Sequence, residues 1–134
     1  MEAVTSLVSD EDRDNRLISR PELNRALSDT RCYLYLAFLE AQTVGLLSAY
    51  RFPDLAAGGQ LVYLYDIEVA VSQRRKGVGA ALIETLATAC RDDAVRLIWA
   101  GTERENSAAC NTFETTGAAL EGDAYVEYEW VLED

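Results

Sequence analysis

The chain has 134 residues, which is enough to bury roughly two-thirds of its unfolded surface in one core, so we expect a single domain. It contains no histidine, which excludes Ser-His and Cys-His nucleophile pairs and His-ligated metal sites. The net charge of −11, from 23 acidic and 12 basic residues, argues against a nucleic-acid or anionic-membrane surface and favours a cationic partner.

The remaining composition is that of an ordinary folded protein, and it predicts neither a metal site nor a membrane anchor. The three cysteines have no C-x-x-C spacing and follow no signal-peptide pattern, so reduced thiols in a cytoplasm are expected. No apolar run approaches the roughly 18 residues of a membrane span.

The first part of the chain predicts helices followed by a hairpin. Residues 1–31 are polar and indicate two short helices joined by a charged loop, with Pro21 at a helix start. Residues 32–39 and 43–51 are β-rich runs at hairpin spacing. Pro53 and the following Gly58-Gly59 pair mark a loop.

The middle of the chain predicts a central strand, a loop and a helix. Residues 61–71 are too apolar for a solvent-facing strand, yet they carry Asp66 and Glu68. After a glycine-containing turn, apolar residues recur at helical spacing from Val78 to Cys90.

The last third predicts a short strand, a helix and a final strand. Residues 96–100 form the strand, and the helix opens near Asn106 and closes at Gly117. The tail alternates, with Val126, Tyr128, Trp130 and Leu132 on one face, which is typical of a half-exposed strand.

Three consecutive basic residues lie just before the helix predicted from Val78 to Cys90, and they predict an anion site. Glycines let the backbone approach a ligand closely, the N-terminus of a helix offers unpaired N–H groups, and arginine binds phosphate oxygens bidentately. The expected ligand is a pyrophosphate. The P-loop and Rossmann fingerprints both fail here, so a nucleotide is held differently. The site comprises Arg74, Arg75, Lys76, Gly77, Val78, Gly79 and Ala80.

The segment R-R-K-G-V-G-A-A-L resembles the acyl-CoA pyrophosphate loop, R-x-x-G-x-G/A, of the GNAT acetyltransferase superfamily. Asn106, Ala109, Phe113 and Gly117 fit its second signature, N-x-x-A-x-x-x-Y/F-x-x-x-G. The resemblance covers residues 20–132. It implies an α/β (α+β) GNAT fold, a mixed, mostly antiparallel splayed sheet flanked by helices, with acetyl-CoA as cosubstrate. Asn106, Ala109 and Phe113 then join the cofactor-binding residues.

Within that superfamily, Y-L-Y-D-I-E-V at residues 63–69 resembles the GNAT-type aminoglycoside 3-N-acetyltransferases, which read Y-I-Y-D-L-A-V. The resemblance implies that Asp66 accepts the proton of the acceptor amine. It also implies that the backbone of Ile67, Glu68 and Val69 faces the pantetheine arm and polarises the thioester carbonyl. A carboxylate in an apolar strand has a raised pKa, which suits a base. The structural alternative is that Asp66 bonds a backbone amide at a bulge.

Two departures from the family pattern stand out. Phe113 replaces a tyrosine that protonates the leaving thiolate in many members, so water, Tyr65 or Tyr125 is left for that step. Family members also begin with a strand before the first helix, whereas Met1 stands where that helix begins, so we expect the first strand to be missing. The resemblance also suggests a homodimer.

An aminoglycoside carries several ammonium groups, so its site is expected to be lined with carboxylates. Cysteine catalysis through Cys110 is disfavoured because nothing activates the thiol. Two alternatives stay open: a GNAT enzyme acting on a polyamine, other small amine or protein amino group, and an acyl-CoA-binding module without turnover. The expected acceptor contacts are Asp66, Tyr65, Glu103 and Glu129, with Asp10, Glu11, Asp12, Asp14, Glu121 and Glu127 as further acids.

Overall fold

The computed structural model describes residues 19–122 and 126–133. The chain divides into two compact units, Met1–Gly101 and Thr102–Asp134, and each is described by itself. The organisation as one domain stays a prediction. The acidic cluster Asp10, Glu11, Asp12 and Asp14, the first predicted helix, and Tyr125 lie outside the described residues.

The first described element of the first unit is the helix α3, Arg20–Ser28. Its N-cap is Ser19, whose side chain accepts a hydrogen bond from the backbone N–H of Glu22 at 3.3 Å. Pro21 lies in the first turn, where a missing N–H costs nothing. The prediction that Pro21 marks a helix start is therefore confirmed.

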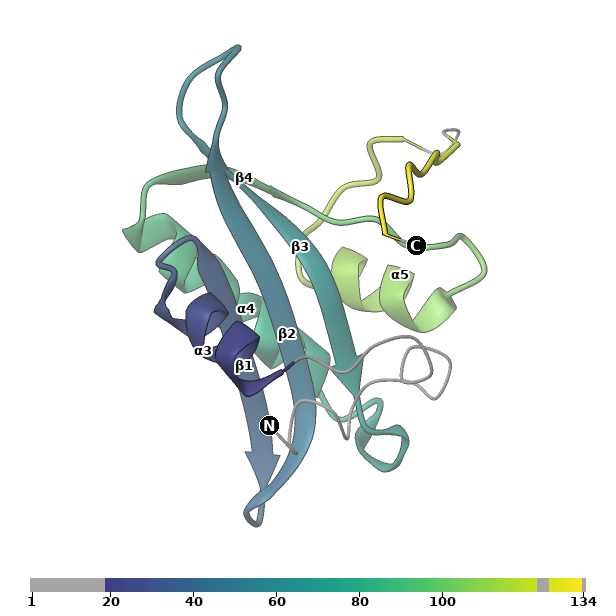
Figure 1. The fold of residues 1–134 in the computed structure, drawn as a ribbon. Coiled ribbons are helices and arrows are strands. Elements are labelled where there is room, and N and C mark those ends of the chain that lie inside the picture. The colour runs from purple at the N-terminus through teal and green to yellow at the C-terminus, as the bar shows by residue number, and fades with distance from the viewer. Residues whose placement is uncertain (1–18, 123–125, 134) are drawn as a thin grey trace. The chain divides into compact units, whose positions relative to one another are not determined.

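Four strands form one sheet in the order β1-β2-β3-β4 (Figure 1). The first three pair antiparallel, and β4 pairs parallel to β3. This confirms the predicted mixed, mostly antiparallel sheet. Residues 19–31 contain no strand. The strands are β1 Cys32–Leu39, β2 Gln42–Pro53, β3 Gln60–Val69 and β4 Val95–Trp99.

The hairpin between β1 and β2 is tighter than its sequence predicts. Leu39 pairs with Gln42, so Glu40 and Ala41 alone form the turn. Their φ angles are 50° and 67°, and two consecutive left-handed residues match the right-handed twist of a two-residue hairpin. The sequence lacks the Asn-Gly signal of such a turn, which is why a three-residue connection was expected.

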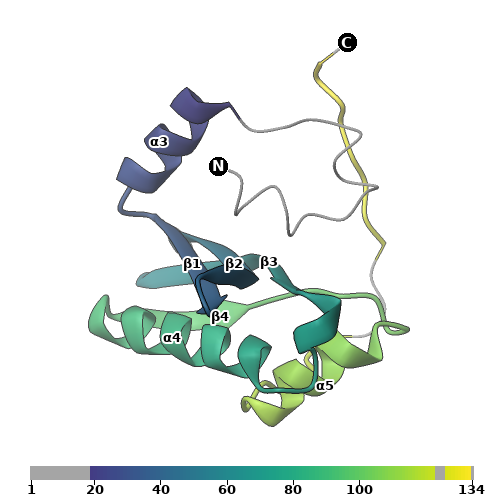
Figure 2. The same cartoon turned by 90° about the horizontal axis from the view of Figure 1, so that it is seen from below.

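The helix α4, Val78–Asp92, covers one face of the sheet, and α3 lies on the opposite side (Figure 2). Leu82, Leu86 and Cys90 recur at helical spacing and are the buried residues of α4. They pack with Leu47 and Val62 of the sheet to form the core. The predicted strand–loop–helix order is confirmed, although β3 ends at Val69 and a 3₁₀ turn, η1 Val71–Gln73, follows.

The second unit contains the helix α5, Ser107–Thr115. Asn106 is its N-cap, with Oδ1 accepting from the N–H of Ala109 at 3.1 Å, and Gly117 (φ 101°) follows its end in the left-handed conformation. Both predicted boundaries are confirmed. The predicted tail strand is wrong for the described residues 126–133, which form no strand, because alternation alone cannot make a strand without a hydrogen-bonding neighbour.

Candidate functional site

A β-bulge interrupts the pairing of β3 with β2 beside the predicted catalytic residue. Ser48 lies opposite Asp66, but the next residue of β2, Ala49, lies opposite Leu64. Tyr65 is therefore the extra residue of the bulge. Such an insertion changes which side chains of a strand face the core.

The bulge moves Asp66 out of the hydrophobic core. Before the bulge, Val62 and Leu64 belong to the core beneath α4; after it, Ile67, opposite the fully buried Leu47, packs against that core. Asp66 lies on the other face of the sheet, where it is half-buried. The bulge that the structural alternative for Asp66 requires is thus present, and it also presents the carboxylate on an accessible face.

Asp66 influences the ionisation of Tyr50 on the same face of the sheet. Burial is the main cause that raises the pKa of Tyr50 above its ordinary value, and the negative charge of Asp66 is a further cause. Tyr50 lies two residues along β2 from Ser48, on the same face. The face opposite α4 therefore carries Asp66 beside an aromatic side chain.

The sheet is splayed where β3 carries the expected cofactor contacts. The parallel pairing of β3 and β4 runs from Gln60 to Tyr63, whose partner Trp99 is the last residue of β4. Beyond that point, no described strand pairs with this edge of β3. An extended ligand can add to a sheet edge that has no neighbouring strand. Residues 67–69, including Glu68, lie in this stretch.

The cationic turn, residues 74–77, follows β3 and η1 and is exposed. The Nε of Arg74 donates a hydrogen bond to the carbonyl oxygen of Val69 at 3.2 Å, which ties the turn to the end of β3. The Nζ of Lys76 donates to Oε1 of Gln73 at 3.5 Å. Arg75 adopts a left-handed φ of 65°, which is uncommon for a residue with a side chain and is typical of loops that approach a ligand.

The N-terminus of α4 begins directly at this turn. Its N-cap, Gly77, is left-handed (φ 82°), and no side chain caps the helix. The N–H groups of the first turn therefore lack side-chain acceptors, and the helix dipole places partial positive charge there. Val78, Gly79 and Ala80 lie in that turn and are half-buried. The seven residues of the predicted anion site thus form the cationic turn and the first turn of α4, and their binding of an anion stays a prediction.

A glycine of β2 sets how closely this helix start approaches the sheet. A Cβ added to Gly45 would lie 2.8 Å from Cγ1 of Val78 and 3.1 Å from Cδ1 of Leu82. Such distances are below ordinary van der Waals contact, so a Cβ at this position would require Val78 and Leu82 to shift. Sequence reasoning did not identify Gly45, although a glycine inside a strand is a signal of close backbone approach.

The remaining predicted site residues belong to the second unit. Ala109 and Phe113 of α5 are half-buried, and the side chain of Asn106 caps the helix. Glu103 and Glu129 are exposed. Their participation in a site with Asp66 stays a prediction, as does the role of Phe113 beside the cofactor. Cys110 is half-buried, with its Sγ 3.9 Å from the carbonyl oxygen of Glu103.

Five aromatic side chains of the first unit, here called the aromatic patch, form a contiguous cluster that sequence reasoning missed. Ring centroids lie 5.8 Å apart for Tyr50 and Tyr65, 6.3 Å for Tyr63 and Tyr65, and 5.1 Å for Tyr63 and Trp99. Phe52 contacts Trp99 edge-on at 5.4 Å. Alternate aromatic residues in β2 and β3 were the available signal. The members are Tyr50, Phe52, Tyr63, Tyr65 and Trp99.

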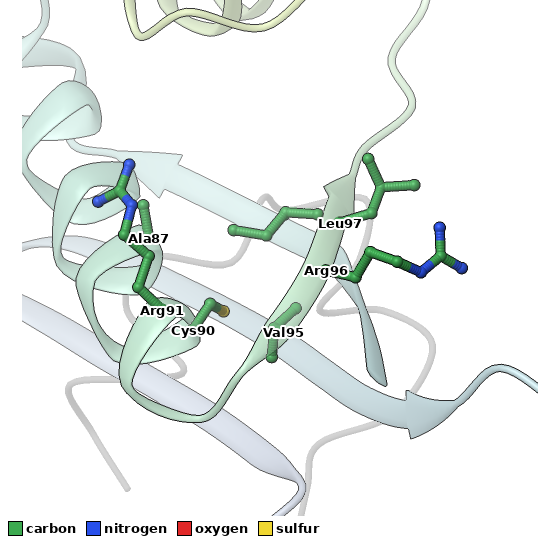
Figure 3. Close-up of a pocket in the computed structure, with 7 residues that line it drawn as sticks. Ala87, Cys90, Arg91, Val95, Arg96 and Leu97 are labelled. Atoms are coloured by element: carbon green, nitrogen blue, oxygen red, sulfur yellow. The ribbon is translucent and has the colours of Figure 1, made fainter. Parts of the chain in front are cut away.

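A pocket of about 230 Å³ lies elsewhere, between the C-terminal half of α4 and β4 (Figure 3). Cys90 and Val95 line it, and Arg96 points away from α4. The cationic turn adjoins the other end of α4, so this pocket is separate from the predicted anion site.

Across the described ranges, no three metal-binding side chains gather into a cluster, and none of the described helices has the length and apolarity needed to cross a membrane.

Solved structures share this fold. One is an aminoglycoside acetyltransferase, meta-AAC0020, from an uncultured soil metagenomic sample in complex with sisomicin, at 22% identity and a TM-score of 0.82 over 98% of this chain and 83% of that chain. Another is the aminoglycoside N-acetyltransferase AAC(6')-Iy in complex with CoA, at 17% identity and a TM-score of 0.77 over 98% and 93%.

A third is a ribosomal-protein-alanine N-acetyltransferase from Brucella melitensis biovar Abortus 2308, at 20% identity and a TM-score of 0.73 over 96% of this chain and 92% of that chain. At these identities the likeness establishes the fold and leaves the acceptor open. No curated protein matches the sequence. The sequence model of the Acetyltransferase (GNAT) family matches residues 1–118, so the chain belongs to that family.

Proposed function

We propose that the protein transfers an acetyl group from acetyl-CoA to an amine of a cationic acceptor, and that this acceptor is an aminoglycoside. The observation that carries the proposal is the continuity of three features in one unit. The end of β3, beyond its pairing with β4, leads through η1 into the cationic turn, and α4 begins directly after this turn.

Each part of acetyl-CoA has a matching feature in this stretch. The pyrophosphate binds the charges of Arg74, Arg75 and Lys76 and the first-turn N–H groups of α4, since a helix N-terminus and guanidinium groups both favour phosphate oxygens. The pantetheine arm, which carries amides, hydrogen-bonds along residues 67–69 as an added strand would. The second-unit residues Asn106, Ala109 and Phe113 complete the cofactor contacts by resemblance to the family.

The reaction then needs one base. An ammonium acceptor must lose a proton before its nitrogen attacks the thioester carbonyl carbon, and Asp66 takes that proton. The new C–N bond forms, the C–S bond breaks, the CoA thiolate leaves, and the nitrogen releases its second proton to solvent. Backbone N–H groups of β3 stabilise the oxyanion formed on the way. Because Phe113 has no hydroxyl, the thiolate takes its proton from water or Tyr65.

The proposed acceptor is supported by the net charge of the chain and by the solved structures that share its fold. A net charge of −11 attracts polycations, and an aminoglycoside acetyltransferase with 22% identity binds sisomicin. Two alternatives have their own support: a structural neighbour acts on a ribosomal-protein alanine, which favours a protein amino group, and the lost tyrosine at Phe113 favours a CoA-binding module without turnover.

Replacing Asp66 by Asn tests the proposal. We expect kcat to fall by about 10²–10⁴, the usual contribution of a positioned base, while acetyl-CoA affinity measured by calorimetry is unchanged. The matched control is Asp92→Asn, an exposed carboxylate at the far end of α4, which keeps wild-type turnover. Turnover is followed as CoA-thiol release with gentamicin, spermidine and a basic peptide as acceptors.

The outcomes separate the candidate functions. Release with gentamicin supports the aminoglycoside assignment, and release with the peptide alone contradicts it. No release with any acceptor, despite tight acetyl-CoA binding, supports the binding module. If Asp66→Asn keeps full turnover, Asp66 is not the base, and its role at the bulge is structural.

A further inference from the structure

The aromatic patch presents ring faces and edges on the side of the sheet opposite α4. Its residues come from three adjacent strands, β2, β3 and β4, and all five are partly accessible. Tyr65 is 65% exposed and Trp99 is 40% exposed, so the patch has a large accessible apolar area. A contiguous aromatic surface next to acidic groups is unusual in a protein that needs only to stay soluble.

Two carboxylates adjoin the patch on the same face. Asp66 follows Tyr65 directly and lies opposite Ser48, two residues from Tyr50 on the same face of β2. Glu68 is two residues farther along β3 and, beyond the bulge, shares the face of Asp66. A ligand resting on the rings thus meets negative charge at one edge of the patch.

We propose that the aromatic patch seats a sugar ring of an aminocyclitol-type acceptor and holds the reacting ammonium group at Asp66. The inference rests on the proposed function and deepens it, because it assigns the residues that select a ring-bearing acceptor over a linear polyamine. In this role, Tyr65 and Trp99 bind the acceptor through their aromatic rings.

The physical reason is a match between two surfaces. The C–H face of a sugar ring is apolar and flat, so it packs on an aromatic face, while ammonium groups at the rim are attracted to the negative ring faces and to the carboxylates. A linear polyamine has the charges but no rigid face, and it loses chain entropy when it is held straight. The patch therefore adds affinity for ring-bearing acceptors in particular.

Trp99 supplies a readout that needs no turnover. The chain has two tryptophans, and the other, Trp130, is 82% exposed in the second unit. In a Trp130→Phe background the fluorescence reports on Trp99 alone. We expect gentamicin to quench or shift this emission in the presence of CoA, and spermidine at equal charge concentration to leave it unchanged.

Kinetics with the variant Tyr65→Leu supply the second readout. We expect the KM for gentamicin to rise about tenfold, as the loss of one stacked aromatic contact implies, while the KM values for spermidine and acetyl-CoA change less than about twofold. The matched control is Phe38→Leu, an aromatic side chain of β1 that is 61% exposed and does not belong to the patch. It leaves all three KM values unchanged.

Several outcomes overturn the inference. One is an equal fluorescence response to gentamicin and spermidine; another is acetylation of gentamicin without any change at Trp99. A third is acrylamide quenching as weak as that of a buried tryptophan in the ligand-free protein, since this shows that the chain itself covers the patch. If instead Trp99 responds to gentamicin but no acetyl transfer occurs, the aromatic patch binds the acceptor as inferred and the proposed function fails.

Discussion

The guanidinium of Arg74 links the cationic turn to the central strand. Its Nε donates to the carbonyl oxygen of Val69, the last residue of β3, at 3.2 Å. The same side chain is an expected ligand of the pyrophosphate, so one arginine both orients the turn and carries charge. Arg75, with its left-handed backbone, places the second charge next to it.

We predict that changing Arg74 and Arg75 together to Ala weakens acetyl-CoA binding about 100-fold, because each charge-assisted hydrogen bond contributes about 1.5–3 kcal/mol. The Kd is measured by calorimetry. Unfolding by urea changes little, since exposed charges contribute little to stability. The control pair, Arg20→Ala with Arg25→Ala on α3, keeps the affinity. Equal affinity in the double variant at 74 and 75 removes the anion-site argument.

At the scale of elements, the start of α4 is fixed by the absence of a side chain in β2. Gly45 allows Val78 and Leu82 to contact the strand, and this sets the position of the helix N-terminus relative to β3. The predicted anion site therefore depends on the packing of a strand residue that lies outside it. A change there reaches the anion site through the packing of the helix.

We predict that Gly45→Ala weakens acetyl-CoA binding several-fold and lowers the free energy of unfolding by about 1–3 kcal/mol, as overpacking does. Calorimetry and urea unfolding measure the two effects. Gly58→Ala is the control, because Gly58 is left-handed but has open space around it, so strain lowers stability without affecting the Kd. Shortening Val78 to Ala in the Gly45→Ala background restores affinity if steric displacement is the cause; failure of this rescue contradicts that account.

At the scale of the first unit, a polar network joins β1, β2 and the end of α4. The hydroxyl of Tyr33 donates to Oδ2 of Asp93 at 2.7 Å, and Nη1 of Arg51 donates to the Tyr33 oxygen at 3.1 Å. Arg51 and Asp93 also form an ion pair of 3.0 Å. Burial, followed by the hydrogen bond to Asp93, raises the pKa of Tyr33 well above its ordinary value.

We predict that Tyr33→Phe lowers the free energy of unfolding by about 1 kcal/mol at pH 7, the net value of a hydrogen bond. Because the pKa of Tyr33 is higher in the folded state, the unfolded state releases the Tyr33 proton first. The stabilisation that Tyr33 contributes is therefore fully present below about pH 10 and falls as the pH rises above that value. Urea titrations at pH 7 to 11 should therefore show the gap between wild type and variant shrinking above about pH 10.

The control for this network is Tyr128→Phe, which removes an exposed hydroxyl from the tail. It should leave the stability unchanged throughout the pH range. A gap between wild type and Tyr33→Phe that stays constant up to pH 11 would mean that Tyr33 titrates normally in the folded protein.

Local patterns predicted the helices of the described residues, the hairpin and the strands of the sheet, because hydrophobic spacing and cap residues such as Asn106 act within a few positions along the chain. The cationic turn was predictable for the same reason, since its charges and glycines are consecutive. The tail strand was not, because a strand needs a neighbour and the sequence of 126–133 does not specify one.

By itself, the sequence determined that Asp66 lies in an inner strand of the sheet and that a cationic turn follows this strand, while the anion site at that turn stays a prediction. It could not determine where the carboxylate faces, because Val62, Leu64 and Asp66 share one parity and a regular strand would bury them all together. Only the tertiary structure decided this: pairing with β2 inserts Tyr65 as a bulge, turns Asp66 to the open face, and gathers the aromatic patch from three strands. Register is a property of two chain segments in contact, so it exists only once the sheet has formed.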